Sequence, residues 1–277
     1  MTDKVLVRVD DDGNATVMLN RPEVHNAFDP EMVEGLTAAL QDLEDNEAVR
    51  AVVLIGAGTS FSAGADIAHM KKSAGHGRKQ NLEAALQTAR MFYKLHTLKK
   101  PTIACIRGAV RGGGCGLVAA CDIAIAGRTA TFRLSEVKLG IIPAMISPYV
   151  VAAMGQRMAQ RYMITGEEFD AAEAYRIGFV HDICEDEDLR RKVGQQLAHI
   201  YTSGPKAVLA VKELIPMIAH VPVVEDIVEE TAQRLAELRA TPEAQEGLTA
   251  FLEKRQVAWA TPPKKPAKRP TRKKRTT

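Results

Sequence analysis

Cysteine is scarce in this chain, with four residues in 277 and no Cys-x-x-Cys pair among them. Small proteins held by disulfides need a denser, paired set, and structural zinc sites need closely spaced Cys and His ligands. The seven histidines do not cluster with the cysteines at such spacings. The sequence therefore excludes a disulfide scaffold, predicts no metal site and indicates free thiols in a reducing compartment. The four thiols are Cys105, Cys115, Cys121 and Cys184.

Long apolar runs are also missing. No stretch approaches the roughly 20 apolar residues that cross a bilayer. The start of the chain, Met1-Thr-Asp-Lys-Val-Leu6, lacks the apolar core of a signal peptide. We therefore expect a cytoplasmic protein without a membrane partner.

A strong excess of one charge is absent from the whole chain, whose net charge is +3, but the balance hides an asymmetry. The last seventeen residues, 261–277, contain eight Lys or Arg and no acid, so the remainder carries −5. We expect this Pro- and Lys-rich tail to be disordered. Because it lacks aromatic residues, it is a candidate only for weak, sequence-independent binding of polyanions such as nucleic acid, and a solubilising extension is the alternative.

Turn signals divide the first part of the chain into strands and helices. Asp11-Asp-Gly-Asn14 separates two β-branched runs, 5–9 and 15–19, and predicts a hairpin. Asp29 followed by Pro30 predicts the start of a helix, which carries apolar residues on one face. These residues are Met32, Val33, Leu36, Ala39, Leu40 and Leu43.

The middle of the chain contains a polar segment and then helical patterns. Residues 71–80 show no periodicity, so we expect a mobile surface loop there, and a helix from Asn81 to Leu98. After residue 144 helical patterns dominate, and three glycines mark expected helix ends. These are Gly155, Gly166 and Gly178.

The stretch from Val221 to Gln256 is long, amphipathic and rich in Glu and Ala. An amphipathic helix must bury its apolar face against something. We expect this region to pack on another subunit or to fold back on the core.

Two glycine-bearing loops carry the strongest chemical signal. Phe61-Ser-Ala-Gly-Ala-Asp66 follows the strand-like run 51–55, and Arg111-Gly-Gly-Gly-Cys-Gly116 follows the run 102–106. Small residues after a strand leave backbone N–H groups open to a ligand oxygen. Two such loops side by side would form an oxyanion hole built from amides alone.

Several other site signatures are absent. The glycines of the second loop do not spell Gly-x-Gly-x-x-Gly, no Walker-type Gly-Lys-Ser/Thr follows, and no Gly-x-Ser-x-Gly elbow is present. Cys115 lies within the second loop, but no nearby His activates it, so we interpret it as a small packing residue.

Taken in order along the chain, the motifs resemble those of the crotonase superfamily. Its two signatures are similar to Phe61-Ser-Ala-Gly-Ala-Asp-Ile67 and Ile106-Arg-Gly-Ala-Val-Arg-Gly-Gly-Gly-Cys-Gly-Leu-Val-Ala-Ala-Cys-Asp122. Further matches are Asn20-Arg-Pro-x-x-His-Asn-Ala-Phe28, Ser135-Glu-Val-Lys-Leu-Gly-Ile-Ile-Pro143 and Phe251-Leu-Glu-Lys-Arg-x-x-x-Trp259. The resemblance spans residues 4–259, and several spaced motifs are more specific than any single glycine loop.

The resemblance implies an α/β fold, a ClpP-like spiral of ββα repeats. It implies a spiral core over 1–200 and a helical trimerisation region over 201–260, and the chain then ends in the basic tail, 261–277. We expect homotrimers, which often pair into hexamers. No cofactor is implied, because coenzyme A arrives as part of an acyl-CoA substrate.

The resemblance also assigns site residues. The amides of Ala65 and Gly113 are expected to hold the thioester carbonyl, and the family's proton-exchanging glutamate falls on Glu136. The substrate and coenzyme A site is expected to be lined by Ala63, Ala65, Asp66, Ile67, Ala68 and Gly113.

One departure from the family pattern changes the expected mechanism. Family hydratases use two glutamates, and the position of the first is Gly116 here. A single glutamate suits a Δ3,Δ2-enoyl-CoA isomerase, because one base can remove a proton at one carbon and return it at another. Hydration remains open if Glu136 or a substrate group handles the water, and a non-enzymatic acyl-CoA or nucleic-acid binder is the third reading.

The segment around Glu136 is similar to a bacterial branch that hydrates branched glutaconyl-CoA thioesters, such as the methylglutaconyl-CoA hydratases of leucine or isoprenoid catabolism. We favour this enoyl-CoA hydratase activity. A glutaconyl substrate carries a second carboxylate, so a cation is expected near the acyl pocket. Arg107, Arg111 and Lys138 are the candidates.

Overall fold

The computed structural model describes residues 3–260, so the predicted basic tail lies outside the described residues. Its centre is a six-stranded sheet of order β1-β2-β3-β4-β6-β9. All neighbours in it run parallel except the hairpin of the first two strands. The strands are β1 (Val5–Val9), β2 (Asn14–Leu19), β3 (Ala51–Gly56), β4 (Thr102–Ile106), β6 (Ile123–Gly127) and β9 (Asp182–Cys184).

A second, three-stranded sheet of order β5-β7-β8 completes the strand architecture. Within it β5 and β7 run parallel and β8 is antiparallel to β7. Its strands are β5 (Ala109–Arg111), β7 (Thr131–Arg133) and β8 (Glu168–Asp170). Because β4 leads into β5 through a short turn, the chain passes from one sheet to the other beside the second glycine loop.

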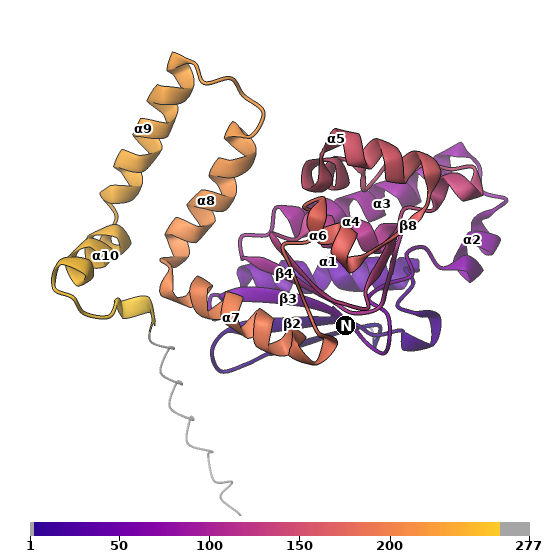
Figure 1. The fold of residues 1–277 in the computed structure, drawn as a ribbon, viewed down its shortest axis with the longest axis horizontal. Helices are drawn as coiled ribbons and strands as arrows, with labels where there is room; N and C mark the ends of the chain where they lie inside the picture. Colours follow the sequence, from indigo (N-terminus) through magenta and orange to yellow (C-terminus); the bar gives the residue numbers. More distant parts are fainter. Residues whose placement is uncertain (1–2, 261–277) are drawn as a thin grey trace, which may run out of the picture.

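Helices cover both faces of the large sheet (Figure 1). On one face the main apolar core joins the sheet to four helices. They are α1 (Pro30–Asp45), α3 (Arg78–His96), α4 (Gly113–Ala120) and α5 (Ser147–Thr165). On the other face α7 (Leu189–Thr202) packs over β4 and β6 with its own small core. The short α6 (Ala171–Arg176) lies between β8 and β9 in the sequence.

The expected hairpin and first helix are confirmed. In the hairpin, Val5 pairs with Leu19 and Val9 with Ala15, and Gly13 adopts a φ of +85° in the turn. The Asp29 side chain accepts a hydrogen bond of 2.9 Å from the Met32 amide, which caps α1. The six apolar residues expected on one face of this helix are the six that it buries.

The expected loop over 71–80 is wrong in part. Residues up to Ser73 belong to α2 (Ile67–Ser73), and α3 begins at Arg78, three residues before the expected start. Helix α2 buries none of its residues, so no apolar periodicity marks it in the sequence. The true connection contains Gly75 and Gly77.

The three glycines expected at helix ends have different roles. Gly166 caps α5 with a left-handed φ of +57°, and Gly178, with φ +77°, follows the end of α6. Gly155, with a φ of +74° and a ψ of +157°, is not helical and separates two helical segments that meet at a kink within α5, so a helix does end there. Short 3-10 turns fill other connections: η1 (Pro22–Val24), η2 (Glu136–Leu139), η3 (Asp186–Asp188) and η4 (Ala258–Ala260).

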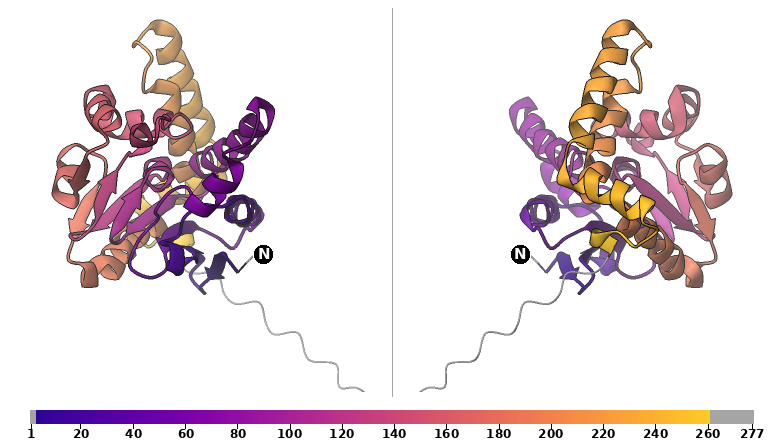
Figure 2. Two further views of the ribbon diagram at one scale, coloured as in Figure 1. Left: turned by 90° about the vertical axis from the view of Figure 1, so that its right-hand side faces the viewer. Right: turned by 90° about the vertical axis from the view of Figure 1, so that its left-hand side faces the viewer.

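Three C-terminal helices extend beyond the body of the molecule (Figures 1 and 2). We call them the C-terminal arm: α8 (Pro205–Ile218), α9 (Glu225–Arg239) and α10 (Pro242–Leu252). The amphipathic stretch 221–256 is thus two helices, because Thr241 caps a new one. None of the helices in residues 3–260 is long and apolar enough to cross a membrane.

The arm is fastened to the body at its base. The Lys212 ammonium of α8 lies 2.8 Å from Asp122 Oδ2, just beyond the end of α4. The same carboxylate oxygen accepts hydrogen bonds from the amide and hydroxyl of Thr102, at 2.7 and 2.8 Å. The first residue of β4 and the arm therefore share one anchor.

Candidate active site

The two glycine loops lie against one another. Ser62 of the first loop forms a parallel bridge with Val110 of β5, and the Arg111 amide donates to the Ser62 carbonyl at 2.8 Å. A Cβ at Gly64 would lie 2.7 Å from the Arg111 carbonyl oxygen and 3.3 Å from the Gly113 nitrogen. Only glycine allows this approach, and it brings the first loop to the start of α4.

Two amides at this junction remain free to donate. Their neighbours are engaged: the Gly64 amide donates to Ser62 Oγ, Asp66 to the Phe28 carbonyl, and Gly112 to the Arg133 carbonyl. Within residues 3–260, the amides of Ala65 and Gly113 donate to no protein acceptor. Free donors of this kind are what a developing oxyanion requires.

Glu136 reaches the same junction from the opposite side. It begins η2, and its Oε1 lies 2.9 Å from the point where a Cβ of Gly112 would stand. Its Oε2 is buried and has no hydrogen-bond partner among the described residues. Burial raises the pKa of this carboxyl above its ordinary value of 4.5, although a hydrogen bond from its own amide lowers it in part.

The side of α4 one turn beyond Gly113 is apolar and closed. A Cβ on Gly116 would lie 2.8 Å from Ile146 Cβ and 2.9 Å from Phe92 Cε1, with Ile146 Cγ2 closer still. Ile146 and Phe92 are almost completely buried. The Phe92 ring packs edge-on against Phe28, at 6.5 Å between centroids. Gly116 therefore faces side chains rather than an empty pocket.

Asn26 supports the first loop, a role that the sequence motif did not reveal. Its Nδ2 donates to the carbonyls of Ala57 and Ser60 at 2.9 and 2.8 Å, and more weakly to that of Phe61 at 3.3 Å. Its Oδ1 accepts from the Arg21 amide at 2.9 Å. Fully buried and with a φ of +57°, Asn26 fixes the path by which β3 reaches the glycine loop.

Comparison with known proteins identifies the family. The family model for enoyl-CoA hydratase/isomerase matches residues 11–262. The chain belongs to the enoyl-CoA hydratase/isomerase family. The short-chain-enoyl-CoA hydratase of Clostridium acetobutylicum is 32% identical over 246 residues, covering 88% of this chain and 92% of its own. The crotonyl-CoA hydratase of Syntrophomonas wolfei is 33% identical over 249 residues, covering 88% and 93%.

The solved structures confirm the fold of this family member. A crystal structure of an enoyl-CoA hydratase from Shewanella pealeana aligns with a TM-score of 0.89 at 40% identity, covering 92% of this chain and 96% of its own. The expected crotonase fold, with its helical C-terminal region, is therefore correct.

Three of the residues expected to bind coenzyme A in this family member are exposed, whereas the one carboxylate among them is buried. Ala65, Ile67 and Ala68 are exposed beside the oxyanion amides, while Ala63 is half-buried and its amide donates to the His25 carbonyl. The Asp66 side chain is buried, caps α2 by accepting from the His69 amide, and lies 2.8 Å from Arg21 Nη1. Burial opposes ionisation, but these two partners outweigh it and lower the pKa of Asp66.

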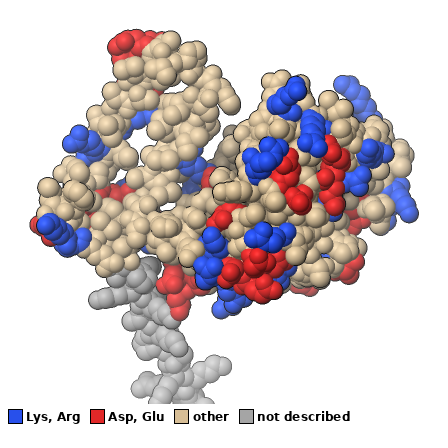
Figure 3. Space-filling view, viewed as in Figure 1, with Lys and Arg blue, Asp and Glu red and all other residues tan. Residues whose placement is uncertain are grey.

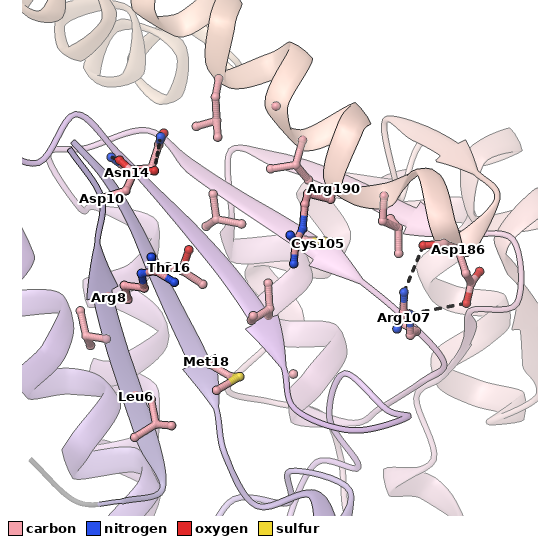
Figure 4. Close-up of a pocket in the computed structure, with 18 of the residues that line it drawn as sticks. Leu6, Arg8, Asp10, Asn14, Thr16, Met18, Cys105, Arg107, Asp186 and Arg190 are labelled. Carbon is pink, nitrogen blue, oxygen red and sulfur yellow. Dashed lines mark hydrogen bonds and ion pairs between the residues drawn. The ribbon is translucent and has the colours of Figure 1, made fainter. Parts of the chain in front are cut away.

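Two of the three cations expected near the acyl pocket are engaged elsewhere. Arg111 pairs with Glu168 at 2.5 Å and donates to Thr131. Arg107 turns to the other face of the large sheet, where it lines a groove beneath α7 and donates to the Asp186 carbonyl at 3.1 Å (Figure 4). Arg111 is thus already paired with an acid, Arg107 lies away from the glycine loops, and the cation near the acyl pocket stays a prediction. Lys138 lies in η2 with Glu136 and has no ion pair among the described residues, and its Cε lies 3.1 Å from the Cβ position of Gly166 at the end of α5.

The thiol nearest the site is buried among apolar residues. Cys115 is buried, and burial raises the pKa of its thiol to about 12, so it is not a nucleophile. Within residues 3–260 no three His, Cys, Asp or Glu residues are grouped to hold a metal ion.

Proposed function

We propose that this chain hydrates an α,β-unsaturated acyl-CoA thioester with Glu136 as its only side-chain acid and base. One observation carries the proposal: a buried carboxylate oxygen without a partner lies beside two amides that are free to donate. The amides would polarise the thioester carbonyl and stabilise the enolate that forms when a nucleophile adds to the β-carbon. The similar hydratases named above support the reaction class.

One carboxylate can carry out both proton transfers of the hydration. Ionised Glu136 takes a proton from water as the oxygen adds to the β-carbon, and the electron pair of the double bond moves to the thioester as an enolate. The neutral Glu136 then delivers that proton to the α-carbon, and the carbonyl re-forms. A raised pKa suits this double role, because the group then exchanges protons closer to neutral pH. The reaction needs no cofactor.

For the substrate we propose a branched glutaconyl-CoA, such as 3-methylglutaconyl-CoA. With apolar side chains beside Gly116, no second protein carboxylate orients the water, and the free carboxylate of such a substrate would supply one. Lys138 is the residue that we propose to pair with it. The unpaired thiols of residues 3–260 agree with the cytoplasm as the compartment.

The test compares hydration of 3-methylglutaconyl-CoA and crotonyl-CoA, followed as loss of the conjugated thioester absorbance. Faster turnover of the glutaconyl substrate, abolished in Glu136→Gln, is the expected result. Lys138→Met should raise KM for the glutaconyl substrate only, whereas the matched variant Arg107→Met, on the far face of the sheet, should leave it unchanged. Absence of hydration with both substrates would overturn the proposal.

Isomerisation of a 3-enoyl-CoA is the second candidate function, because Ile146 and Phe92 leave no charged group on the side of α4 beyond Gly113. One base suffices for that reaction. It creates conjugated absorbance instead of destroying it, so the same spectrometer distinguishes the two activities.

For assembly we propose a homotrimer, or a hexamer of two such trimers, held together through the C-terminal arm. Two apolar side chains at the end of α10 and one in the connection between α8 and α9 are 79–86% exposed, and Figure 3 shows few charges on this face of the arm. A monomer rarely leaves a large contiguous apolar patch to water. These side chains are Val223, Phe251 and Leu252.

A further inference from the structure

The packing around Gly116 determines more than the absence of a carboxylate. Gly116 lies in a helical segment without a positive φ, so its backbone conformation is open to any residue. What requires glycine is space, because a Cβ would meet Ile146 and Phe92 at distances that real Cβ atoms do not show. The constraint therefore comes from two side chains that are distant in sequence.

Ile146 is the nearer of the two and the one that can be changed locally. It occupies the N-cap position of α5, where glycine is well tolerated, and it is 2% exposed. Phe92 is fixed more firmly, since its ring also contacts Phe28 and Tyr149, and its Cζ lies 3.7 Å from the Cβ position of Gly113. Ile146 and Phe92 thus form one continuous apolar surface beside α4, which extends from Gly116 to Gly113.

We propose that Ile146 is a specificity-determining residue, which excludes a side chain from position 116 and so reserves the reaction for substrates that carry their own polar group. This inference rests on the proposed function for its substrate preference, but its packing claim stands on geometry alone. With Ile146 present, an unassisted substrate such as crotonyl-CoA meets only Glu136. With Ile146 removed, the remaining close contact at position 116 is the edge of the Phe92 ring, whose Cε1 lies 2.9 Å from the Cβ position, so a small displacement of that ring admits a second carboxylate to hold the water.

The packing claim is tested with a cycle of Gly116→Ala, Ile146→Gly and the double variant, measured by thermal unfolding. Gly116→Ala alone should lower Tm by several degrees, and it should lower Tm much less when Ile146 is already glycine. Glycine is chosen rather than alanine because the Ile146 Cβ itself lies 2.8 Å from the clash position. Equal effects of Gly116→Ala in both backgrounds would overturn the claim, whether or not the protein is a hydratase.

The specificity claim is tested with Gly116→Glu/Ile146→Gly. Relative to Ile146→Gly, this variant should raise kcat/KM for crotonyl-CoA at least tenfold while changing that for 3-methylglutaconyl-CoA little. The isosteric control Gly116→Gln/Ile146→Gly should fold equally well and show no gain. An unchanged ratio of the two substrates in the folded glutamate variant overturns the role in specificity. If the parent protein hydrates neither substrate, the proposed function fails, and the Tm cycle still decides the packing claim.

Discussion

Replacing Asn26 should both destabilise the protein and impair the site, because this side chain holds the first glycine loop. Asn26→Ala removes an Nδ2 that serves the carbonyls of Ala57 and Ser60, and an Oδ1 that serves the Arg21 amide. Leaving a buried polar group without a partner costs about 1–3 kcal/mol. Each carbonyl oxygen has a second lone pair, which limits its loss. We therefore expect the lost hydrogen bonds together to lower the free energy of unfolding by about 3 kcal/mol.

The backbone adds a second cost. Asn26 has a φ of +57°, a conformation in which alanine is about 1 kcal/mol less favourable. Asn26→Ala should therefore lower the free energy of unfolding by about 4 kcal/mol, and Asn26→Gly, which keeps the side-chain loss but relaxes the backbone, by about 3 kcal/mol. Urea unfolding measures both values.

The hydration rate of the two Asn26 variants is the second measurement. Because the supported loop carries the Ala65 amide, kcat should fall in both variants even at temperatures where they remain folded. A loss of stability below about 1 kcal/mol in Asn26→Ala, the ordinary size for a point mutation, would refute this reasoning. So would a stable variant with full kcat, since the loop would then hold its position without Asn26.

Predictions for three further variants concern catalysis, ionisation and assembly. Glu136→Gln should lower kcat by about 10²–10⁴-fold. Burial raises the pKa of Glu136, so its charged form destabilises the folded protein as pH rises above about 4.5. Glu136→Gln should therefore raise Tm at neutral pH, and this gain should disappear on acidification. A gain in Tm that is the same at every pH contradicts this prediction. The lowered pKa of Asp66 contributes stability that is complete above its ordinary value of 3.8 and lost as pH falls below it, so Asp66→Asn should flatten the Tm profile in that acidic range. Phe251→Ser/Leu252→Ser should shift the mass measured by light scattering to that of a monomer, and an unchanged mass would exclude the arm as the interface.

Local signals explain which parts of the fold were predictable. The hairpin turn and the Asp29 cap are set by neighbouring residues, and the structure confirms both. Helix α2 was missed because it buries nothing and its last turn, Lys71 to Ser73, looks like solvent-exposed loop. Its start depends on Asp66, whose N-cap hydrogen bond is stabilised by Arg21, and no local pattern shows that pairing.

The site divides in the same way. The two glycine loops could be predicted because a strand, small residues and a helix follow one another directly in the sequence. Arg107 and Arg111 were chosen by closeness to the motifs in sequence, which says nothing of side-chain direction: Arg111 pairs with Glu168 on β8, and Arg107 lies on the opposite face of the sheet. Ile146 escaped notice because it lies thirty positions after Gly116 and meets it only through packing.

Helix α4 connects two parts of the molecule that are described separately above. Its first residue supplies the Gly113 amide, and just past its last turn stands Asp122, to which Lys212 of the arm is bound. Eight residues of helix form a short strut of about 12 Å. We expect a displacement of the arm at Asp122 to be transmitted along this rigid helix to the Gly113 amide. If the arm forms the proposed subunit interface, dilution that separates the subunits should slow turnover before the protein unfolds.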